Sequence, residues 1–334
     1  ELSQAFTAYN TRIVAPPHGS MLPMSPVRKN ILMVACALGL LIPVVIIFIC
    51  ENMNTRVRGR KDLESVTVPF IGEIPLFTRK KKGIFRKKPQ EVRAIVVKEG
   101  RRDIINEAFR VLRTNLEFMT GKDKASNVII VTSFNPGSGK SFLTMNIAVS
   151  FAIKGKKVLV IDGDLRHGSA SSYIDSPTKG LSDYLGGRID NLNEIIVTNP
   201  KQKYLDILPV GTIPPNPTEL LFDDRLKQVI DTVREQYEYV LIDCPPIELV
   251  ADTQIIEKLA DRTIFVVRAG LLELSMLAEL EKIYEEKKYK NMSLILNGTE
   301  GSGGRYGYRY GYRYGYHYGY GSEYHYGSDE KYIE

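Results

Sequence analysis

Short runs of valine, isoleucine and leucine recur through most of the chain and alternate with segments of helical periodicity. A run that is apolar on both faces suits a strand covered on both sides, which is typical of a parallel sheet flanked by helices. Such runs lie within 127–133, 157–162, 204–210, 237–244, 262–268 and 292–298, and helices are expected near 140–153, 217–236 and 273–287. The pattern predicts an α/β domain with a mainly parallel sheet, whose binding sites lie at the carboxyl ends of the strands.

Residues 31–50 form a different apolar feature, twenty positions without a charged side chain. A helix that rises about 1.5 Å per residue would cross roughly 30 Å of hydrocarbon with that length. Basic residues are more numerous after this run than before it, which favours a cytoplasmic location for everything that follows. A cleaved signal peptide fits less well, because no small-residue cleavage site follows the run. We therefore expect a transmembrane helix.

The two apolar features divide the chain into five predicted regions. These are a proline-rich extracytoplasmic stub at 1–26, the transmembrane helix at 27–50, a basic juxtamembrane linker at 51–98, the α/β domain at 99–299 and a disordered tail at 300–334. Because the chain begins with glutamate and not with methionine, we expect it to be a fragment of a longer protein.

The predicted linker carries much of the formal net charge of +6, with seven basic residues between Arg79 and Lys88. Such a run can hold anionic lipid headgroups or simply keep a linker soluble. The apolar stretch 66–77 inside the linker is expected to add an accessory strand or two. The three cysteines lack the spacing of a disulfide framework or a metal site, which fits a reducing compartment.

The first apolar run leads into the sequence NPGSGKS, which matches the end of a phosphate-binding loop although Phe134 stands where a glycine is usual. Small residues let backbone N–H groups surround a phosphate, while Lys140 reaches the β and γ phosphates and the Ser141 hydroxyl can bind Mg²⁺. A plain glycine turn is the alternative. The residues predicted to bind the nucleotide are Asn135, Pro136, Gly137, Ser138, Gly139, Lys140, Ser141 and Phe142.

Acidic residues end two further strands. Asp162 and Asp164 follow one apolar run, and Asp243 follows another. Each alone could be a helix cap or a turn residue. Beside a phosphate-binding loop, however, they fit phosphoryl transfer, which needs a metal held by carboxylate and hydroxyl groups and a base close to the attacking oxygen.

A charged face marks the helix predicted within INEAFRVLRTNLEFM. Glu107, Arg110 and Arg113 are spaced three apart and therefore lie on one face of that helix. The spacing allows two interpretations, a solvated face with an ion pair inside the helix or a charged seam between subunits.

The tail contains eleven tyrosines, interleaved mainly with glycine and arginine. Glycine makes a strand unfavourable, so we expect a solvated segment with accessible hydroxyls. Three uses compete: a stacking platform for nucleic acid, sites for chemistry on the phenol oxygen, or an inert tail. From Gly301 onward four basic and four acidic residues cancel, which argues against nucleic acid. The predicted phosphoacceptors are Tyr306, Tyr308, Tyr310, Tyr312, Tyr314, Tyr316, Tyr318, Tyr320, Tyr324, Tyr326 and Tyr332.

Together the three motifs, the helix EAFRVLRTNL, the phrase KGLSDYLGG, the membrane span and the tyrosine cluster resemble the bacterial tyrosine kinases of polysaccharide co-polymerase systems. The resemblance covers almost the whole chain. It implies a P-loop NTPase fold, ATP and Mg²⁺ as cofactors, and autophosphorylation of the tyrosine cluster. It also implies a location in the bacterial inner membrane and a role in exopolysaccharide or capsule polymerisation and export.

The resemblance further implies roles for residues. Lys140 and Ser141 would hold phosphate and Mg²⁺, Asp162 would be the base, and Asp164 and Asp243 would support the metal. The implied catalytic set is Lys140, Asp162, Asp164 and Asp243, and the implied metal set is Ser141, Asp162, Asp164 and Asp243. Glu107, Arg110 and Arg113 match the family's ring-assembly motif. The implied partners are further copies in a ring such as an octamer, membrane lipids, the polysaccharide machinery and a cognate tyrosine phosphatase.

One departure from the family and one alternative bear on this interpretation. Most of the extracytoplasmic domain and a first membrane span expected in the family are absent from the sequence. The runner-up is a membrane-bound ATPase of the partitioning type, which switches association state without modifying side chains. Those ATPases carry an additional lysine in the phosphate loop where this chain has Asn135, which favours the kinase.

Overall fold

The computed structural model describes residues 27–52, 54–77, 94–120, 127–199, 202–247 and 251–300. Predictions for the stub at 1–26, the basic run at 79–88 and the tyrosines of the tail lie outside the described residues. The chain divides into two units between Asn54 and Thr55. Each is described here by itself.

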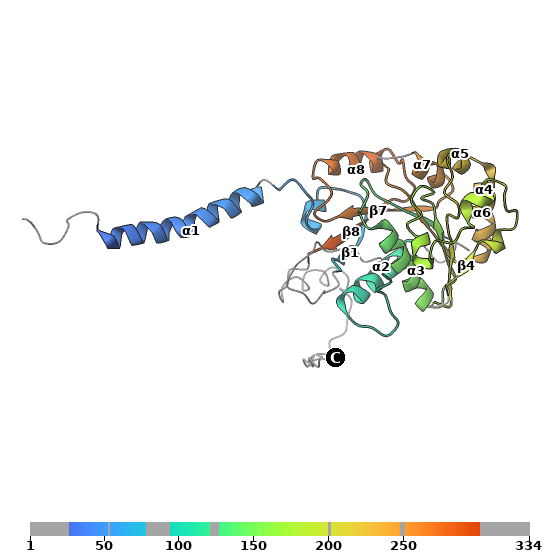
Figure 1. Ribbon diagram of the computed structural model, residues 1–334, viewed down its shortest axis with the longest axis horizontal. Coiled ribbons are helices and arrows are strands. Elements are labelled where there is room, and N and C mark those ends of the chain that lie inside the picture. Colours follow the sequence, from blue (N-terminus) through green and yellow to red (C-terminus); the bar gives the residue numbers. More distant parts are fainter. Residues whose placement is uncertain are drawn as a thin grey trace, which may run out of the picture. The chain divides into compact units, whose positions relative to one another are not determined.

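The first unit contains one helix, α1, which spans Arg28–Asn52 with Pro43 in its interior (Figure 1). The described side chains along it are exposed from Val27 to Ile49. By length and composition, α1 is the one helix among the described residues that could cross a membrane. It lies where the sequence predicts a transmembrane helix.

The second unit is built on an eight-stranded sheet in the order β1-β8-β7-β2-β6-β3-β5-β4. Neighbouring strands are parallel in every pair except β4 with β5. The strands are β1 Phe70–Pro75, β2 Asn127–Thr132, β3 Val158–Asp162, β4 Val197–Thr198, β5 Leu205–Leu208, β6 Tyr239–Asp243, β7 Arg262–Arg268 and β8 Ser293–Thr299. Because β2, β6 and β3 are adjacent, their carboxyl ends meet at one point of the sheet edge.

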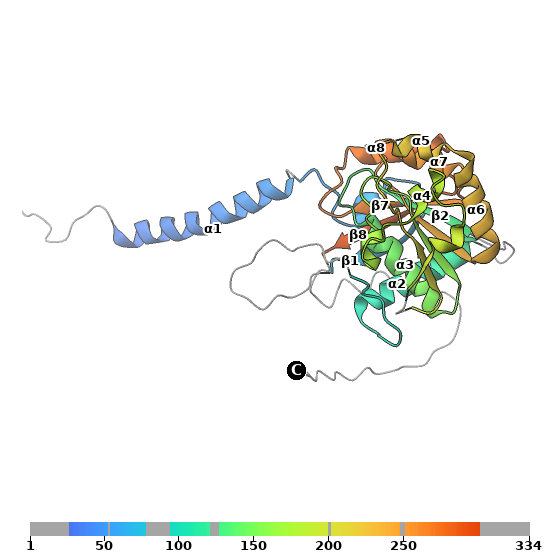
Figure 2. The same cartoon turned by 45° about the vertical axis from the view of Figure 1, so that its right-hand side comes forward.

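Helices cover both faces of this sheet, as Figures 1 and 2 show. One face is covered by α2 and α3, and the other by α4 to α8. The helices are α2 Ile104–Thr120, α3 Lys140–Ile153, α4 Leu181–Leu185, α5 Pro217–Leu221, α6 Asp224–Gln236, α7 Asp252–Glu257 and α8 Met276–Glu285. The predicted class, a mainly parallel α/β sheet between helices, is confirmed.

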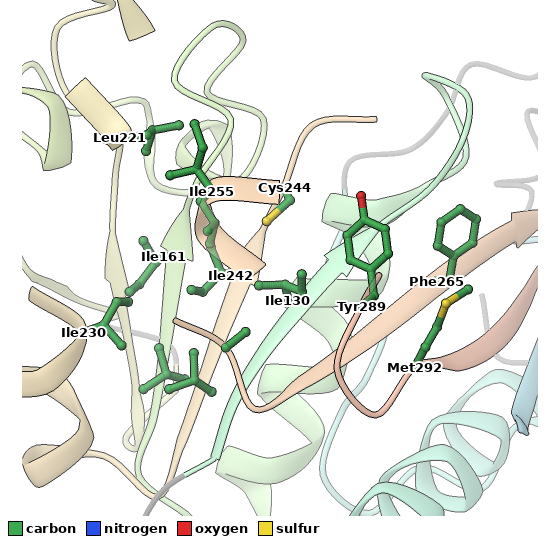
Figure 3. Close-up of a cluster of buried hydrophobic side chains, with 14 of the residues drawn as sticks. Ile130, Ile161, Leu221, Ile230, Ile242, Cys244, Ile255, Phe265, Tyr289 and Met292 are labelled. Carbon is green, nitrogen blue, oxygen red and sulfur yellow. The ribbon is translucent and has the colours of Figure 1, made fainter. Parts of the chain in front are cut away.

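The core has two layers, one on each side of the sheet. Successive residues of a strand point to opposite faces, so Val128 and Ile130 of β2 belong to one layer and Ile129 and Val131 to the other. In Figure 3, Ile130, Ile161 and Ile242 from three strands lie in one cluster with Leu221, Ile230 and Ile255 from the helices that cover this face. Burial on both faces explains why these strands read as continuous apolar runs.

The prediction of one continuous helix near 217–236 is wrong. The segment 217–236 forms two helices, because α5 ends at Leu221 and α6 begins at Asp224. Asp223 between them is extended, and its side chain accepts a hydrogen bond at 2.8 Å from the backbone N–H of Arg225. An aspartate that caps a new helix in this way competes with continuation of the previous one.

The segment expected to be a linker is folded in its first half. Strand β1 pairs in parallel with β8, and Ile71 and Ile74 are buried. Upstream, Val57 donates its N–H to the carbonyl of Leu272 at 2.9 Å and accepts from the N–H of Gly270 at 2.8 Å. Residues 55–77 therefore belong to the α/β unit, which begins well before residue 99. The accessory strand expected within 66–77 is therefore present as β1, and what differs from the prediction is that it belongs to the α/β sheet and not to a linker.

Candidate nucleotide and catalytic site

The loop between β2 and α3 has the backbone of a phosphate cradle. Gly137 and Gly139 have φ values of +73° and +86°, which disfavour any residue with a Cβ. A Cβ at Gly139 would lie 2.2 Å from Nδ2 of Asn297. That Nδ2 donates a hydrogen bond to the carbonyl of Ser138 at 2.8 Å, so β8 fixes the loop from the side.

Lys140 is the first residue of α3 and lies where the helix amino terminus favours an anion. Its side chain is buried, and Nζ lies 3.4 Å from the Ser133 hydroxyl. Burial lowers the pKa of Lys140, while the negative charges of Asp243 and Asp164 oppose that effect. The ammonium group is thus held close to the acidic residues.

Asp162 and Asp243 lie opposite each other at the ends of β3 and β6. Oδ2 of Asp162 accepts two hydrogen bonds of 2.6 Å from Ser171, one from the backbone N–H and one from the hydroxyl. Within the described part of the chain, Oδ1 of Asp162 and both oxygens of Asp243 have no hydrogen-bond partner. The Ser141 hydroxyl is near enough to lower the pKa of Asp243, but its geometry is not that of a hydrogen bond.

Three carboxylate oxygens are therefore buried without a partner, which is costly unless a cation or a proton joins them. Burial raises the pKa of Asp162 to about 6. Burial, and then repulsion by Asp162, raises the pKa of Asp243 to about 8. These residues fit a hard cation such as Mg²⁺.

No three acidic, histidine or cysteine side chains of the described residues converge closely enough to hold a metal alone. An Mg²⁺ ion here would take the Ser141 hydroxyl, one or two of the predicted carboxylates, water and phosphate oxygens, as this ion commonly does with nucleotides.

Asp164 is placed differently from the other two acids, since it lines an open cavity of about 470 Å³. Its Oδ1 accepts backbone hydrogen bonds from Arg166 and His167, each at 3.2 Å. The His167 ring nitrogen Nδ1 lies 3.3 Å from the same carboxylate. Asp162 and Asp243 are almost fully buried and are not among the residues that line the cavity.

Most of the residues predicted to bind the nucleotide also line this cavity. Those that line it are Pro136, Gly137, Gly139, Lys140, Ser141 and Phe142. Asn135 and Ser138 do not, and the Ser138 hydroxyl instead donates to the carbonyl of Asn135 at 2.8 Å. The cavity lining also includes residues that the sequence did not indicate, among them Leu76 and Phe77 just after β1, Arg268 at the end of β7 and Asn297 in β8.

Gly163, between Asp162 and Asp164, occupies a position with no room for a side chain. Its N–H donates to the carbonyl of Asp243 at 2.9 Å, and a Cβ would meet Ile242 Cγ2 at 2.9 Å and Ile256 Cδ1 at 3.1 Å. We expect Gly163→Ala to destabilise the protein by about 1–3 kcal/mol through overpacking. Thermal unfolding measures the effect, with Gly59→Ala, which meets nothing within 4 Å, as the control. Equal melting temperatures for both variants would contradict the expectation.

The charged face of α2 is engaged within the subunit. Arg110 pairs with Glu107, and its Nη2 donates to the carbonyl of Arg101 at 2.7 Å. Arg113 reaches across to α3 and donates to the carbonyl of Ser150 at 2.7 Å. The ion pair that the spacing allowed is therefore present, and a contact between subunits stays a prediction.

Comparisons with known proteins identify a family and several relatives that this chain is similar to. Residues 126–296 match a protein family described as an AAA domain. The chain is 35% identical over 209 residues to the tyrosine-protein kinase YwqD of Bacillus subtilis. This match covers 62% of this chain and 87% of YwqD. The chain is also 30% identical over 310 residues to the tyrosine-protein kinase Etk of Escherichia coli K12. This match covers 89% of this chain and 42% of Etk.

A solved structure shows the same fold. The kinase domain of the Escherichia coli tyrosine kinase Etk matches with a TM-score of 0.63 and 28% identity, and the match covers 80% of this chain and 100% of that domain. The chain thus spans less than half the length of full Etk and matches the whole of its kinase domain.

Proposed function

The chain belongs to the bacterial tyrosine-kinase family, and from this membership we propose that it is an ATP-dependent protein-tyrosine kinase that phosphorylates its own tyrosine cluster in trans. The observation that carries the proposal is the juxtaposition of a buried lysine with acidic oxygens that have no hydrogen-bond partner among the described residues, beside an open cavity. Such an arrangement binds a nucleotide and a divalent cation and holds charge at the point of phosphoryl transfer.

The chemistry assigns distinct tasks to the residues. The phosphate loop and the amino terminus of α3 bind the phosphates of ATP, and Lys140 neutralises charge on the transferring group. Mg²⁺, when bound, would neutralise further phosphate charge. The tyrosine oxygen attacks the γ phosphorus as its proton passes to a carboxylate, the new O–P bond replaces the β–γ bridging bond, and ADP leaves.

The family motif assigns the base to Asp162, whose Oδ1 has no hydrogen-bond partner among the described residues. Asp164 is the second candidate, because it lines the cavity that an incoming tyrosine would enter. Comparing the single-turnover rates of Asp162→Asn and Asp164→Asn at saturating Mg²⁺ separates the two assignments, since loss of the base lowers the rate even when the metal site is filled.

Assembly and location are part of the same proposal. The ring would form through the face of α2, where Ile104, Val111 and Phe118 are exposed at intervals of seven residues beside Glu107 and Arg110. Helix α1 would anchor each copy in the bacterial inner membrane with the kinase on the cytoplasmic side. Each phosphate adds about −1.5 to −2 charges, so modification of the tail would loosen the ring by repulsion.

Two further partners follow from the family, a cognate tyrosine phosphatase and the machinery of polysaccharide polymerisation and export. A cognate tyrosine phosphatase would reset the tail, and cycles of assembly and dissociation would regulate the polymerisation and export of an exopolysaccharide or capsule. The phosphorylated tail, once separated from the neighbouring site, is the form that a phosphatase can reach.

A mixing experiment tests both the kinase activity and its trans mode. A chain that ends at Gly304 keeps the site and lacks the acceptors, whereas the full chain with Lys140→Met keeps the acceptors and lacks the catalytic ammonium. We expect phosphotyrosine on the Lys140→Met chain only when both are incubated with ATP and Mg²⁺, as measured by mass spectrometry of the tail. If the Lys140→Met chain stays unphosphorylated in the mixture while the wild-type chain phosphorylates itself, phosphorylation in trans would be rejected. If the wild-type chain forms no phosphotyrosine, the kinase activity itself would be rejected.

A further inference from the structure

A hydrogen-bonded triangle of Arg166, Thr218 and Asp252 lies outside the residues that line the cavity, and of the three only Asp252 is buried. Nε of Arg166 lies 3.2 Å from Oδ2 of Asp252, and Nη2 of Arg166 donates to the Thr218 hydroxyl at 2.9 Å. The same hydroxyl donates to Oδ1 of Asp252 at 2.7 Å. Both oxygens of Asp252, whose side chain is 1% exposed, are thereby satisfied. The triangle joins the loop after β3 to the starts of α5 and α7.

The next residue of α7 holds a second loop of the site. The Thr253 hydroxyl donates to the carbonyl of Pro245 at 2.9 Å, and that carbonyl also accepts from the Thr132 hydroxyl at 2.9 Å. Pro245 follows Asp243 by two residues, just as Arg166 follows Asp164 by two. Two consecutive residues of α7, Asp252 and Thr253, therefore contact the chain two residues downstream of two predicted metal ligands, Asp164 and Asp243.

The ion pair inside the triangle is hard to explain by stability alone. Burying the Asp252 carboxylate costs desolvation energy, and its partly exposed partner Arg166 offsets that cost less than a fully buried guanidinium would. Arg166 could also reach solvent, because its side chain is 37% exposed, yet it turns inward to Asp252. The pair does fix geometry, because a planar guanidinium constrains both the distance and the angle between the loop after β3 and the helices α5 and α7 that it contacts.

We propose that Arg166, Thr218, Asp252 and Thr253 form a clamp, the α7 clamp, that sets the distance between the loops carrying Asp164 and Asp243. These are positioning residues, because they act through those two aspartates and do not line the cavity. The inference rests on the proposed function for its biological purpose. The physical claim concerns the geometry of the two loops and can be measured without any phosphotransfer.

The test uses the full chain and two variants that alter one partner each, Arg166→Gln and Thr218→Val. We expect the Mg²⁺ concentration that half-maximally tightens ADP binding to rise about tenfold or more, the range usual for residues that support metal ligands. ADP affinity without Mg²⁺ is expected to change by less than about threefold, since the phosphate loop is untouched. Backbone amides of residues 163–168 in the nucleotide-free protein are expected to exchange with solvent faster.

The matched control is Arg234→Gln. Arg234 makes a comparable pair with Asp261, at 2.6 and 3.2 Å, next to the amino end of β7 and away from the site. It is expected to lower thermal stability without changing the Mg²⁺ dependence. In the double variant Arg166→Gln/Thr218→Val the effect should be smaller than the product of the two single effects, because both belong to one network.

The outcomes are distinguishable. Unchanged Mg²⁺ dependence and unchanged amide exchange in both single variants would overturn the clamp, and so would an equal shift in Arg234→Gln, which would indicate general destabilisation. If the two variants show the expected shifts but the wild-type chain makes no phosphotyrosine, the proposed function would be overturned and the clamp would remain supported.

Discussion

Replacing Lys140 with methionine is expected to abolish tyrosine phosphorylation while leaving the protein folded. Methionine is similar in length and apolar, so it fills the buried position without the ammonium group. Removing one preorganised donor to developing charge commonly costs a hundredfold to a thousandfold in rate, and we expect a loss of at least about a hundredfold. The measurement is phosphotyrosine formed on the full chain with ATP and Mg²⁺.

Stability should not fall with activity in this variant. Burial lowers the pKa of Lys140, so the charged form of its side chain is costly in the free protein. The hydrogen bond from its ammonium group to the Ser133 hydroxyl is long, at 3.4 Å. We therefore expect a melting temperature equal to that of the wild type or higher. Loss of both activity and folding would instead make Lys140 a structural residue.

Lys154→Met is the matched control, since Lys154 lies at the opposite end of α3. Its side chain is 49% exposed and pairs with Glu117 at 2.6 Å. Exposed pairs contribute little to stability, and this one is remote from the site. Kinase activity should be retained in Lys154→Met. If Lys140→Met formed as much phosphotyrosine as the wild type, autokinase activity at this site would be rejected.

The sequence was sufficient to predict those elements of the candidate site that depend on local chain order. A phosphate loop must follow a strand and precede a helix, and both Asp162 and Asp243 directly end apolar strands, so a parallel sheet brings them together. Their separate environments could not be predicted. Burial of Asp162 and Asp243 beneath the cavity, with Asp164 on its wall, depends on how the loop turns after β3.

The missed residues share one cause, which is that they come from distant parts of the chain. Phe77, Arg268 and Asn297 reach the cavity because β1, β8 and β7 are neighbours in the sheet, and that order has no local signature. The α7 clamp was missed for the same reason, since Arg166 and Asp252 are 86 residues apart. A local pattern identifies which residues can do chemistry, and the strand order decides which residues surround them.

Replacing Asp243 with asparagine is expected to stabilise the nucleotide-free protein at alkaline pH and to inactivate it. The pKa of Asp243 rises from its ordinary value of 3.8 to about 8, so folding favours the protonated form. Its contribution to stability is fully present below about pH 4 and is lost as the pH rises toward 8. Asp162, with a pKa of about 6, acts in the same direction.

The wild-type protein without nucleotide or Mg²⁺ should therefore melt at progressively lower temperature between pH 5 and pH 8. In Asp243→Asn this decline should be smaller, and the melting temperature at pH 8 should exceed that of the wild type by on the order of 5 °C, equivalent to about 2 kcal/mol for a domain of this size. Asp223→Asn, an exposed helix cap that asparagine can replace, should keep the wild-type slope.

Activity should change in the opposite direction. A metal-supporting carboxylate contributes several kcal/mol to stabilising the transferring group, so its loss should lower phosphotransfer by at least about a hundredfold. A more stable and less active protein would show that these buried charges are retained for catalysis at the expense of folding. An unchanged pH slope in Asp243→Asn would mean that this carboxylate is not held protonated, and the assignment of an unsatisfied acidic pair would be wrong.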